Sequence, residues 1–361
     1  MIWTLSAYVS RLFLGQLAAV GFGFVALLQV FDLLKNARDV MERHGESVTN
    51  LAYYAALRLP GTVSFLLPLC VLVAALMTLT RLAQHNEIVA LKAAGLSIYR
   101  FLLCLAPAVI AVAAAHWLLS DQLAPAAHRA LRQWDAESIA APGKAGNDGR
   151  EIWVRRGGAV VRIAEVLGDG RDLAGVTVFL RDGKGNLTER LAAGKARRME
   201  GGWFLFDVER TVWPLAAPPR QSHLDRLAWA IDLMPRDLVN LSIHPNGLTL
   251  RALLGVAESS GLGRHPEYFY RAWVQKRIAT PASALIMVLL AASVAQTLAR
   301  GHGGAVNFLA GVGLGFLYLI ADGVVFTLGE AGSLPPLLAA WAPLVVFGCI
   351  AGAALIAREG V

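Results

Sequence analysis

Long apolar runs alternate with short polar stretches at both ends of this 361-residue chain. A helix that crosses a membrane needs about 20 mainly apolar residues. Six runs qualify, at residues 12–34, 62–83, 101–120, 278–298, 304–327 and 336–357. The first run is too long for the core of a signal peptide, so we interpret it as a retained span. The pattern predicts three spans, a polar middle region and three further spans.

In the middle region, from Glu151 onward, short runs of alternating apolar and polar residues are typical of β-strands. Glycine-rich turns separate these runs, as expected for an all-β sandwich or roll. The predicted strands are 152–155, 159–166, 175–181, 187–199, 203–213 and 222–232. In the fifth of them, the two-residue period places Phe204, Phe206 and Val208 on one face. The fold class predicted is therefore α+β, with a β domain inserted between helices 3 and 4 of a membrane protein.

A segment of mixed polarity, residues 81–100, connects the second and third runs. Apolar positions, among them Leu91 and Gly95, recur on one side at helical spacing, and Glu87 lies on the polar side. Ala94 and Gly95 are small enough for another surface to approach closely. A solvated loop between two membrane helices is the simpler alternative, but the segment is longer than the usual connection of about 2–8 residues. It is predicted to form an amphipathic helix.

Composition supports the membrane assignment. Hydrophobic residues make up 56% of the chain and charged residues only 16%, against roughly 25% charged in soluble domains. The net charge of +7 favours anionic lipid over nucleic acid as a partner, because no nucleic-acid-binding motif accompanies it. All three cysteines lie inside apolar runs, which argues against a disulfide framework or a cysteine metal site.

Several common catalytic motifs are absent from the sequence. There is no GxxxxGK[ST] loop, so the chain is not expected to hold ATP by itself in the usual way. The glycines at 311, 313 and 315 lie inside an apolar run, where close helix packing explains them better than a nucleotide site. The histidines are scattered, so no metal site is expected. His116, in the third run, is interpreted as a buried hydrogen-bonding group.

Charged residues near the apolar runs are the remaining candidates for function. Asp322 falls inside the fifth run, and two interpretations stay open: a partner or substrate contact within the bundle, or a solvated position at the membrane interface. Positive residues are nearly equal in number on the two sides of the membrane, so the positive-inside rule does not orient the chain. An anionic ligand would explain the cations at the ends of runs one and four, namely Lys35, Arg38, Arg271 and Lys276.

The order of three spans, a β domain and three spans resembles the LptF/LptG family of lipopolysaccharide export permeases over nearly the whole chain. Specific stretches carry this resemblance and point to its LptG branch. They are Phe31-Asp-Leu-Leu-Lys35, Leu82-Ala-Gln-His-Asn-Glu87 with Ala94-Gly95, Ile152-Trp153-Val-Arg with Val161-Arg-Ile163, Leu241-Ser242-Ile, and Pro335-Pro336. The chain departs from the family at Asn36-Ala37-Arg38, where a further lysine is frequent.

The resemblance implies a permease subunit of an ABC transporter in the bacterial inner membrane. Such a subunit extracts lipopolysaccharide and passes it through a periplasmic β-jellyroll domain toward the outer membrane. The implied domains are residues 1–124 with a cytoplasmic coupling helix at 81–100, 125–264 as the jellyroll with flanking helices, and 265–361. The implied partners are LptF, a dimer of the ATPase LptB, LptC and LptA. ATP and Mg would bind the ATPase, so no cofactor and no catalysis are expected in this chain.

The resemblance also assigns roles to particular residues. The coupling helix would dock on LptB through Glu87, Leu91, Ala94 and Gly95. For such a substrate, the excess of cations on the outer side predicts that Lys35, Arg38, Arg271 and Lys276 hold the lipid phosphates. The aromatic residues on the strands predict that Trp153, Phe204 and Phe206 contact acyl chains on the inner face of the β domain. Two alternatives remain open: the paralogous LptF and a membrane protein with a sensory β domain. A secondary transporter would call for charge pairs at mid-membrane and for internal repeats, and we find neither in the sequence.

Overall fold

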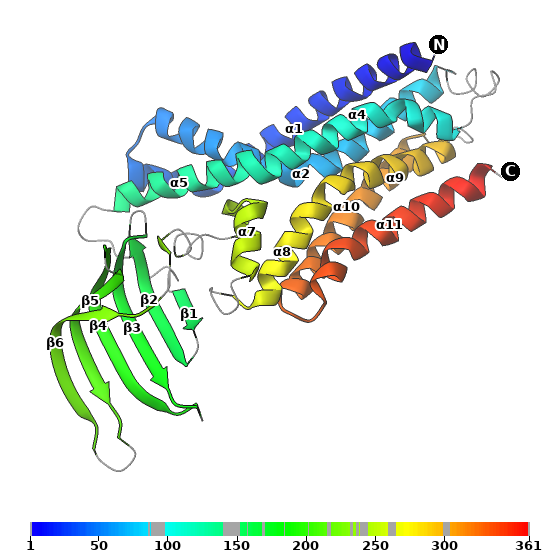
Figure 1. Ribbon diagram of the computed structural model, residues 1–361. Coiled ribbons are helices and arrows are strands. Elements are labelled where there is room, and N and C mark those ends of the chain that lie inside the picture. Colours follow the sequence, from blue (N-terminus) through cyan, green and yellow to red (C-terminus); the bar gives the residue numbers. More distant parts are fainter. Residues whose placement is uncertain are drawn as a thin grey trace. The chain divides into compact units, whose positions relative to one another are not determined.

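The computed structural model divides the chain into two compact units, residues 1–142 with 272–361, and residues 143–271. It describes residues 2–85, 87, 98–139, 152–156, 158–167, 170–183, 185–200, 202–214, 218–231, 234–235, 238, 245–258, 265–298 and 304–359. The first unit is helical and the second contains a β-sheet (Figure 1). The boundary between them falls inside helix α8 (Glu267–Ala279).

The helical unit contains the six predicted spans. Its first half consists of α1 (Ile2–His44), α2 (Val48–Gln84), α4 (Ile98–Leu118), a π-helical turn η1 (Leu119–Leu123) and α5 (Ala124–Ile139). Its second half consists of α8 (Glu267–Ala279), the turn η3 (Thr280–Ala282), α9 (Ser283–Leu298), α10 (Gly304–Glu330) and α11 (Pro336–Glu359). Among the described residues, six helices are long and apolar enough to cross a membrane. The prediction of six transmembrane helices is thereby confirmed.

Helix α2 lies at the centre of the helical core. Every residue from 68 to 76 in it is buried, as expected for a helix that is apolar all round. Gly311 and Gly315 of α10 pack against it: an added Cβ would lie 2.8 Å from Leu76 Cδ1 at the first and 2.2 Å from Leu72 Cδ2 at the second. The predicted close helix packing is confirmed at Gly311 and Gly315, whereas a Cβ at Gly313 would meet nothing within 4 Å.

Helix α5 belongs to the helical unit by its packing. Leu131 forms a small buried cluster with Val40 of α1 and Tyr54 of α2. Trp134 stacks on His44, with ring centroids 3.5 Å apart. The sequence assigned this helix to the β domain from residue 125, whereas the second compact unit begins at Gly143.

The second unit is built on one antiparallel sheet of six strands in sequential order (Figure 1). The strands are β1 (Ile152–Arg156), β2 (Ala159–Leu167), β3 (Asp172–Arg181), β4 (Leu187–Met199), β5 (Gly202–Val212) and β6 (Arg220–Trp229). The turn η2 (Pro245–Gly247) and helix α7 (Leu250–Glu258) follow. The alternation of apolar and polar residues thus located all six strands, and an inserted β domain is confirmed.

One line of irregular positions crosses the sheet from β2 to β6. Each ladder omits a single residue pair at this level, and the omitted pairs involve Ala164, Gly175, Gly194, Asp207 and Asp225 in turn. Gly175 has φ +62 and could not carry a side chain, because an added Cβ would lie 2.8 Å from the Cβ of Ala164. Asp207 has φ 56, a left-handed conformation uncommon outside glycine.

Candidate functional site

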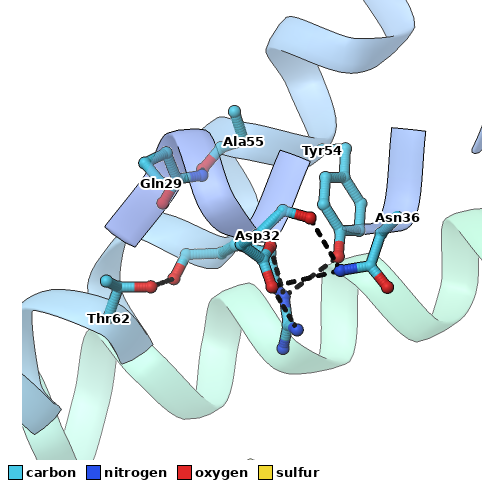
Figure 2. Close-up of polar contacts among 7 residues, drawn as sticks. Gln29, Asp32, Asn36, Tyr54, Ala55 and Thr62 are labelled. Carbon is cyan, nitrogen blue, oxygen red and sulfur yellow. Dashed lines mark hydrogen bonds and ion pairs between the residues drawn. The ribbon is translucent and has the colours of Figure 1, made fainter. Parts of the chain in front are cut away.

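A polar network joins the end of the first apolar run to α2. The Arg58 guanidinium donates to both oxygens of the Asp32 carboxylate, at 2.9 and 3.3 Å, and to the hydroxyl of Tyr54 at 3.2 Å. The amide of Asn36 donates to the same carboxylate at 3.2 Å. Figure 2 shows Asp32, Asn36 and Tyr54 converging at this point. The contact fixes α1 against α2 immediately before Lys35.

Of the four predicted phosphate-binding cations, two lie on α1. Lys35 is exposed, and none of the described residues forms an ion pair with it. Arg38 pairs with Glu42 one helical turn away, at 2.9 Å, and its side chain is 89% exposed. Both residues are therefore accessible to an anionic ligand.

The other two cations lie on α8 and are each paired with an acidic residue. Arg271 pairs with Glu267 on the same helix. Lys276 pairs with Asp322 of α10, and the two side chains are only 21% and 17% exposed. Joint binding of phosphate by Lys35, Arg38, Arg271 and Lys276 stays a prediction.

The partner of Asp322 is therefore a cation of the same chain. The ring of Phe326 lies 5.4 Å from Lys276 Nζ, and Trp273 donates to Glu330 at 2.8 Å beside it. These contacts tie α8 to α10 inside segments that are apolar enough to span a membrane. An internal ion pair explains why a carboxylate is tolerated there.

The predicted coupling segment is only partly described. Glu87 is described, and Tyr8 near the start of α1 donates a hydrogen bond to its carboxylate at 3.1 Å. Leu91, Ala94 and Gly95 lie outside the described residues. The role of all four residues in coupling stays a prediction.

On β5 the predicted arrangement of side chains is wrong. Leu205 and Val208 are both 0% exposed, although a regular strand would place them on opposite faces. Their cross-strand partners, Ala196 and Ala193, are buried as well, so the buried side changes phase at Asp207. The left-handed φ of Asp207 causes this change, and Phe206 does not share a face with Val208.

Phe204 and Phe206 are half-buried on the side opposite Leu205. The guanidinium of Arg226 lies over both rings, 4.0 and 5.8 Å from their centroids. Trp153 is 44% exposed and stacks on Phe179, with centroids 6.3 Å apart. Contact of these three predicted residues with acyl chains stays a prediction, and it would involve half-exposed rings rather than the buried side of the sheet.

Sequence reasoning found only one member, His116, of a group of polar residues in the spans. His116 is 0% exposed, with Nε2 3.1 Å from the carbonyl oxygen of Ser64. Its interpretation as a buried hydrogen-bonding group is confirmed. Ser120 and Arg277 lie in the same group and are 4% and 9% exposed. A sequence signal was present, because prolines follow both serines at short spacing.

The described residues offer no cluster of three or more His, Cys, Asp or Glu that could hold a metal ion. Some polar groups of the helical unit pair between helices instead, as Arg58 does with Asp32 and Lys276 with Asp322.

Comparison with known proteins identifies the family. The family model for the lipopolysaccharide export system permease LptF/LptG matches residues 7–358. The lipopolysaccharide export system permease protein LptG of Escherichia coli K12 is 25% identical over 309 residues, covering 81% of this chain and 82% of that protein. LptG of Haemophilus influenzae is 22% identical over 354 residues, covering 96% of each chain. The chain belongs to the LptF/LptG family of lipopolysaccharide export system permeases.

Proposed function

We propose that this chain is an LptG-type permease subunit that extracts lipopolysaccharide from the inner membrane, together with an LptF-type subunit and a dimer of the ATPase LptB. The observation that carries the proposal is the extent of the similarity. Two LptG proteins align across 81% and 96% of the chain, which takes in both helical halves and the β domain. The β domain would be periplasmic and would pass lipid toward LptC and LptA.

The α1 cations are the strongest candidates for contact with the phosphates of the lipid. An exposed ion pair contributes only about 0–1 kcal/mol, so Arg38 can exchange Glu42 for a phosphate at little cost. None of the described carboxylates pairs with Lys35, and the neighbouring Leu34 is 73% exposed and available to an acyl chain. Lys276 would have to leave Asp322 unpaired in a half-buried position, which is far more costly.

Coupling to the ATPase would run through the segment that contains Glu87. A carboxylate can accept strong charge-assisted hydrogen bonds from a basic groove. The Tyr8 hydroxyl already donates to Glu87, so docking would connect the ATPase directly to the start of α1. Leu91, Ala94 and Gly95 would supply the close-packed side of the same segment.

Affinity purification from the source bacterium in detergent, followed by mass spectrometry of bound proteins and lipids, tests the assignment. We expect an LptB-type ATPase, an LptF-type permease and lipopolysaccharide. Recovery of an LptG-type permease in place of LptF would make this chain the LptF subunit. Recovery of the chain without any ATPase or second permease would overturn the proposal.

Retention of lipopolysaccharide by variants of the purified complex tests the phosphate site. The double variant Lys35→Ala/Arg38→Ala should retain about tenfold less lipid, because each charge-assisted contact contributes roughly 1.5–3 kcal/mol. Arg11→Ala removes an exposed cation from the other end of α1 and is the matched control. Equal retention by the double variant and by Arg11→Ala would exclude the α1 cations from the site.

For the coupling residue, the expected result is a loss of assembly or of ATP-driven lipid release in Glu87→Ala. Tyr8→Phe separates the two contacts of this carboxylate, because it removes the hydrogen bond to Glu87 but leaves the charge available to the ATPase. Normal assembly and release in Glu87→Ala would show that this carboxylate is merely solvated.

A further inference from the structure

Pro68 leaves one backbone carbonyl of α2 without a helical donor. In an α-helix the carbonyl of residue i accepts from the N–H of residue i+4, and proline has no N–H. The carbonyl affected is that of Ser64, and His116 Nε2 of α4 lies 3.1 Å from it. Because a carbonyl can only accept, Nε2 must carry the hydrogen. A side chain of α4 therefore replaces the missing donor of α2.

Pro125 has the same effect on the next span. In the π-helical turn η1, the N–H of Ala124 bonds to the carbonyl of Leu119 five residues earlier. The same spacing would pair the carbonyl of Ser120 with residue 125, which is proline. Arg277 of α8 donates to the Ser120 carbonyl instead. A proline has again freed a carbonyl, and a side chain from a different helix again satisfies it.

The two sites are directly connected. The hydroxyls of Ser64 and Ser120 lie 2.7 Å apart and share a hydrogen bond. Three of the candidate spans, those containing α2, α4 and α8, therefore meet at one level of the helical unit. We call this group the proline clasp; its members are Ser64, Pro68, His116, Ser120, Pro125 and Arg277.

We infer that the proline clasp is a hinge at which the second and third spans bend together. A regular helix can bend sharply only by breaking backbone hydrogen bonds, whereas here the two carbonyls freed by proline are bonded by side chains. Side chains can follow a moving carbonyl, and a guanidinium has five N–H groups with which to keep the bond as α8 shifts. π-Helical turns and prolines are the usual sites of helix kinks. This inference concerns the conformation of the chain alone and does not depend on the proposed transport function.

Double-mutant cycles on the purified full-length chain test the hydrogen bonding. Arg277→Met leaves the Ser120 carbonyl unsatisfied and should lower the melting temperature by several degrees. In a Pro125→Ala background, the N–H of residue 125 can serve that carbonyl, so Arg277→Met should cost less than half as much. Any cost from the nearby buried Asp121 is present in both backgrounds and cancels in the cycle.

A second double-mutant cycle tests the hydrogen bond between His116 and the Ser64 carbonyl. His116→Phe keeps a planar ring but removes the donor, and Pro68→Ala should reduce its cost in the same way. Pro60→Ala, in the same helix, is the control and should leave the cost of His116→Phe unchanged. If the single variant Arg277→Met cannot be purified, recovery of protein on adding Pro125→Ala is the same test. If the two substitutions of each cycle have additive effects, or if Pro125→Ala does not recover the protein, the side chains do not replace the donors missing at the prolines.

Bending is measured by pulsed electron paramagnetic resonance on α2. Leu59 and Met77 are 45% and 37% exposed and flank Pro68, about 27 Å apart along a straight helix. Spin labels at these two positions, in a chain whose native cysteines are replaced, should give a broad distance distribution that Pro68→Ala narrows. Equal widths with and without Pro68 would show a static attachment and overturn the hinge.

Discussion

Helices α1 and α2 are both long and apolar, yet the protein uses them in opposite ways. Two-thirds of the most apolar stretch of α2 is buried inside the chain (67%), and none of that of α1 (0%). Phe22 of α1 is 80% exposed, whereas Leu72 of α2 is 0% exposed. Hydropathy alone cannot distinguish the two, because lipid and protein interior are equally apolar surroundings. The difference identifies α2 as the centre of the fold and α1 as a helix whose side chains are available to lipid or to another chain.

Truncation of α2 should have the largest effect on stability. Leu72→Ala creates a cavity in the buried cluster and should lower the free energy of unfolding by about 2–5 kcal/mol. Phe22→Ala removes a larger side chain from α1 and should change it little. Reversible denaturation in mixed detergent micelles measures both. Similar losses for the two variants would erase the distinction between the helices.

The next effect concerns the close packing of α2 on α10. Gly315→Leu places a side chain where Leu72 already lies, and overpacking costs about 1–3 kcal/mol. Gly313→Leu is matched in helix and in substitution, and a Cβ there meets nothing within 4 Å. The control should be as stable as the parent in thermal melting. A stable Gly315→Leu variant would mean that the two helices are not packed at this distance.

A smaller effect on stability is expected at the ion pair between Asp32 of α1 and Arg58 of α2. Asp32→Asn keeps the shape of the side chain but removes the charge that Arg58 binds. Because both side chains are partly exposed, the loss should be about 1 kcal/mol. High salt should reduce the difference from the parent. A loss as large as that of Leu72→Ala would show that polar contacts, rather than packing, attach α1.

The smallest effect is expected on the exposed side of α1. Arg38→Ala breaks a pair whose side chains are 89% and 60% exposed, and no change in melting temperature should be measurable. Lipid retention, however, should fall if the proposed phosphate contact is correct. This variant therefore separates a stabilising role of the cation from a binding role.

The spans and strands could be predicted because their signals are local. An apolar run of membrane length and a two-residue alternation are both visible within about 20 residues. The phase change on β5 could not be predicted, because nothing in the sequence announces that Asp207 adopts a left-handed φ. Phe206 and Val208 were expected on the same face, and this one residue between them places them on opposite faces.

The functional contacts were harder still to predict from the sequence, because they join residues that are distant in it. Arg277 and Ser120 are 157 positions apart, and Lys276 and Asp322 are 46 apart. The sequence identified Lys276 and Asp322 separately as unusual charges but did not pair them. It contained the prolines of the clasp, yet gave no indication of which helices would supply the replacement donors.

At the line of irregular positions across the sheet, the alternation of buried and exposed side chains is displaced by one residue. On β3, Leu173 is buried before the line, and Val176 and Val178 are buried after it; on β4 the same change occurs between Ala193 and Ala196. Strands β3, β4 and β5 shift together, so the apolar side stays continuous across them. Deleting Asp207 alone would give Leu205 and Val208 a regular two-residue spacing, but it would shift one half of β5 by one residue against β4 and β6, which keep their irregular positions. Residues on this line can therefore be removed only together across neighbouring strands, and Gly175 cannot be replaced singly, because an added Cβ would lie 2.8 Å from the Cβ of Ala164.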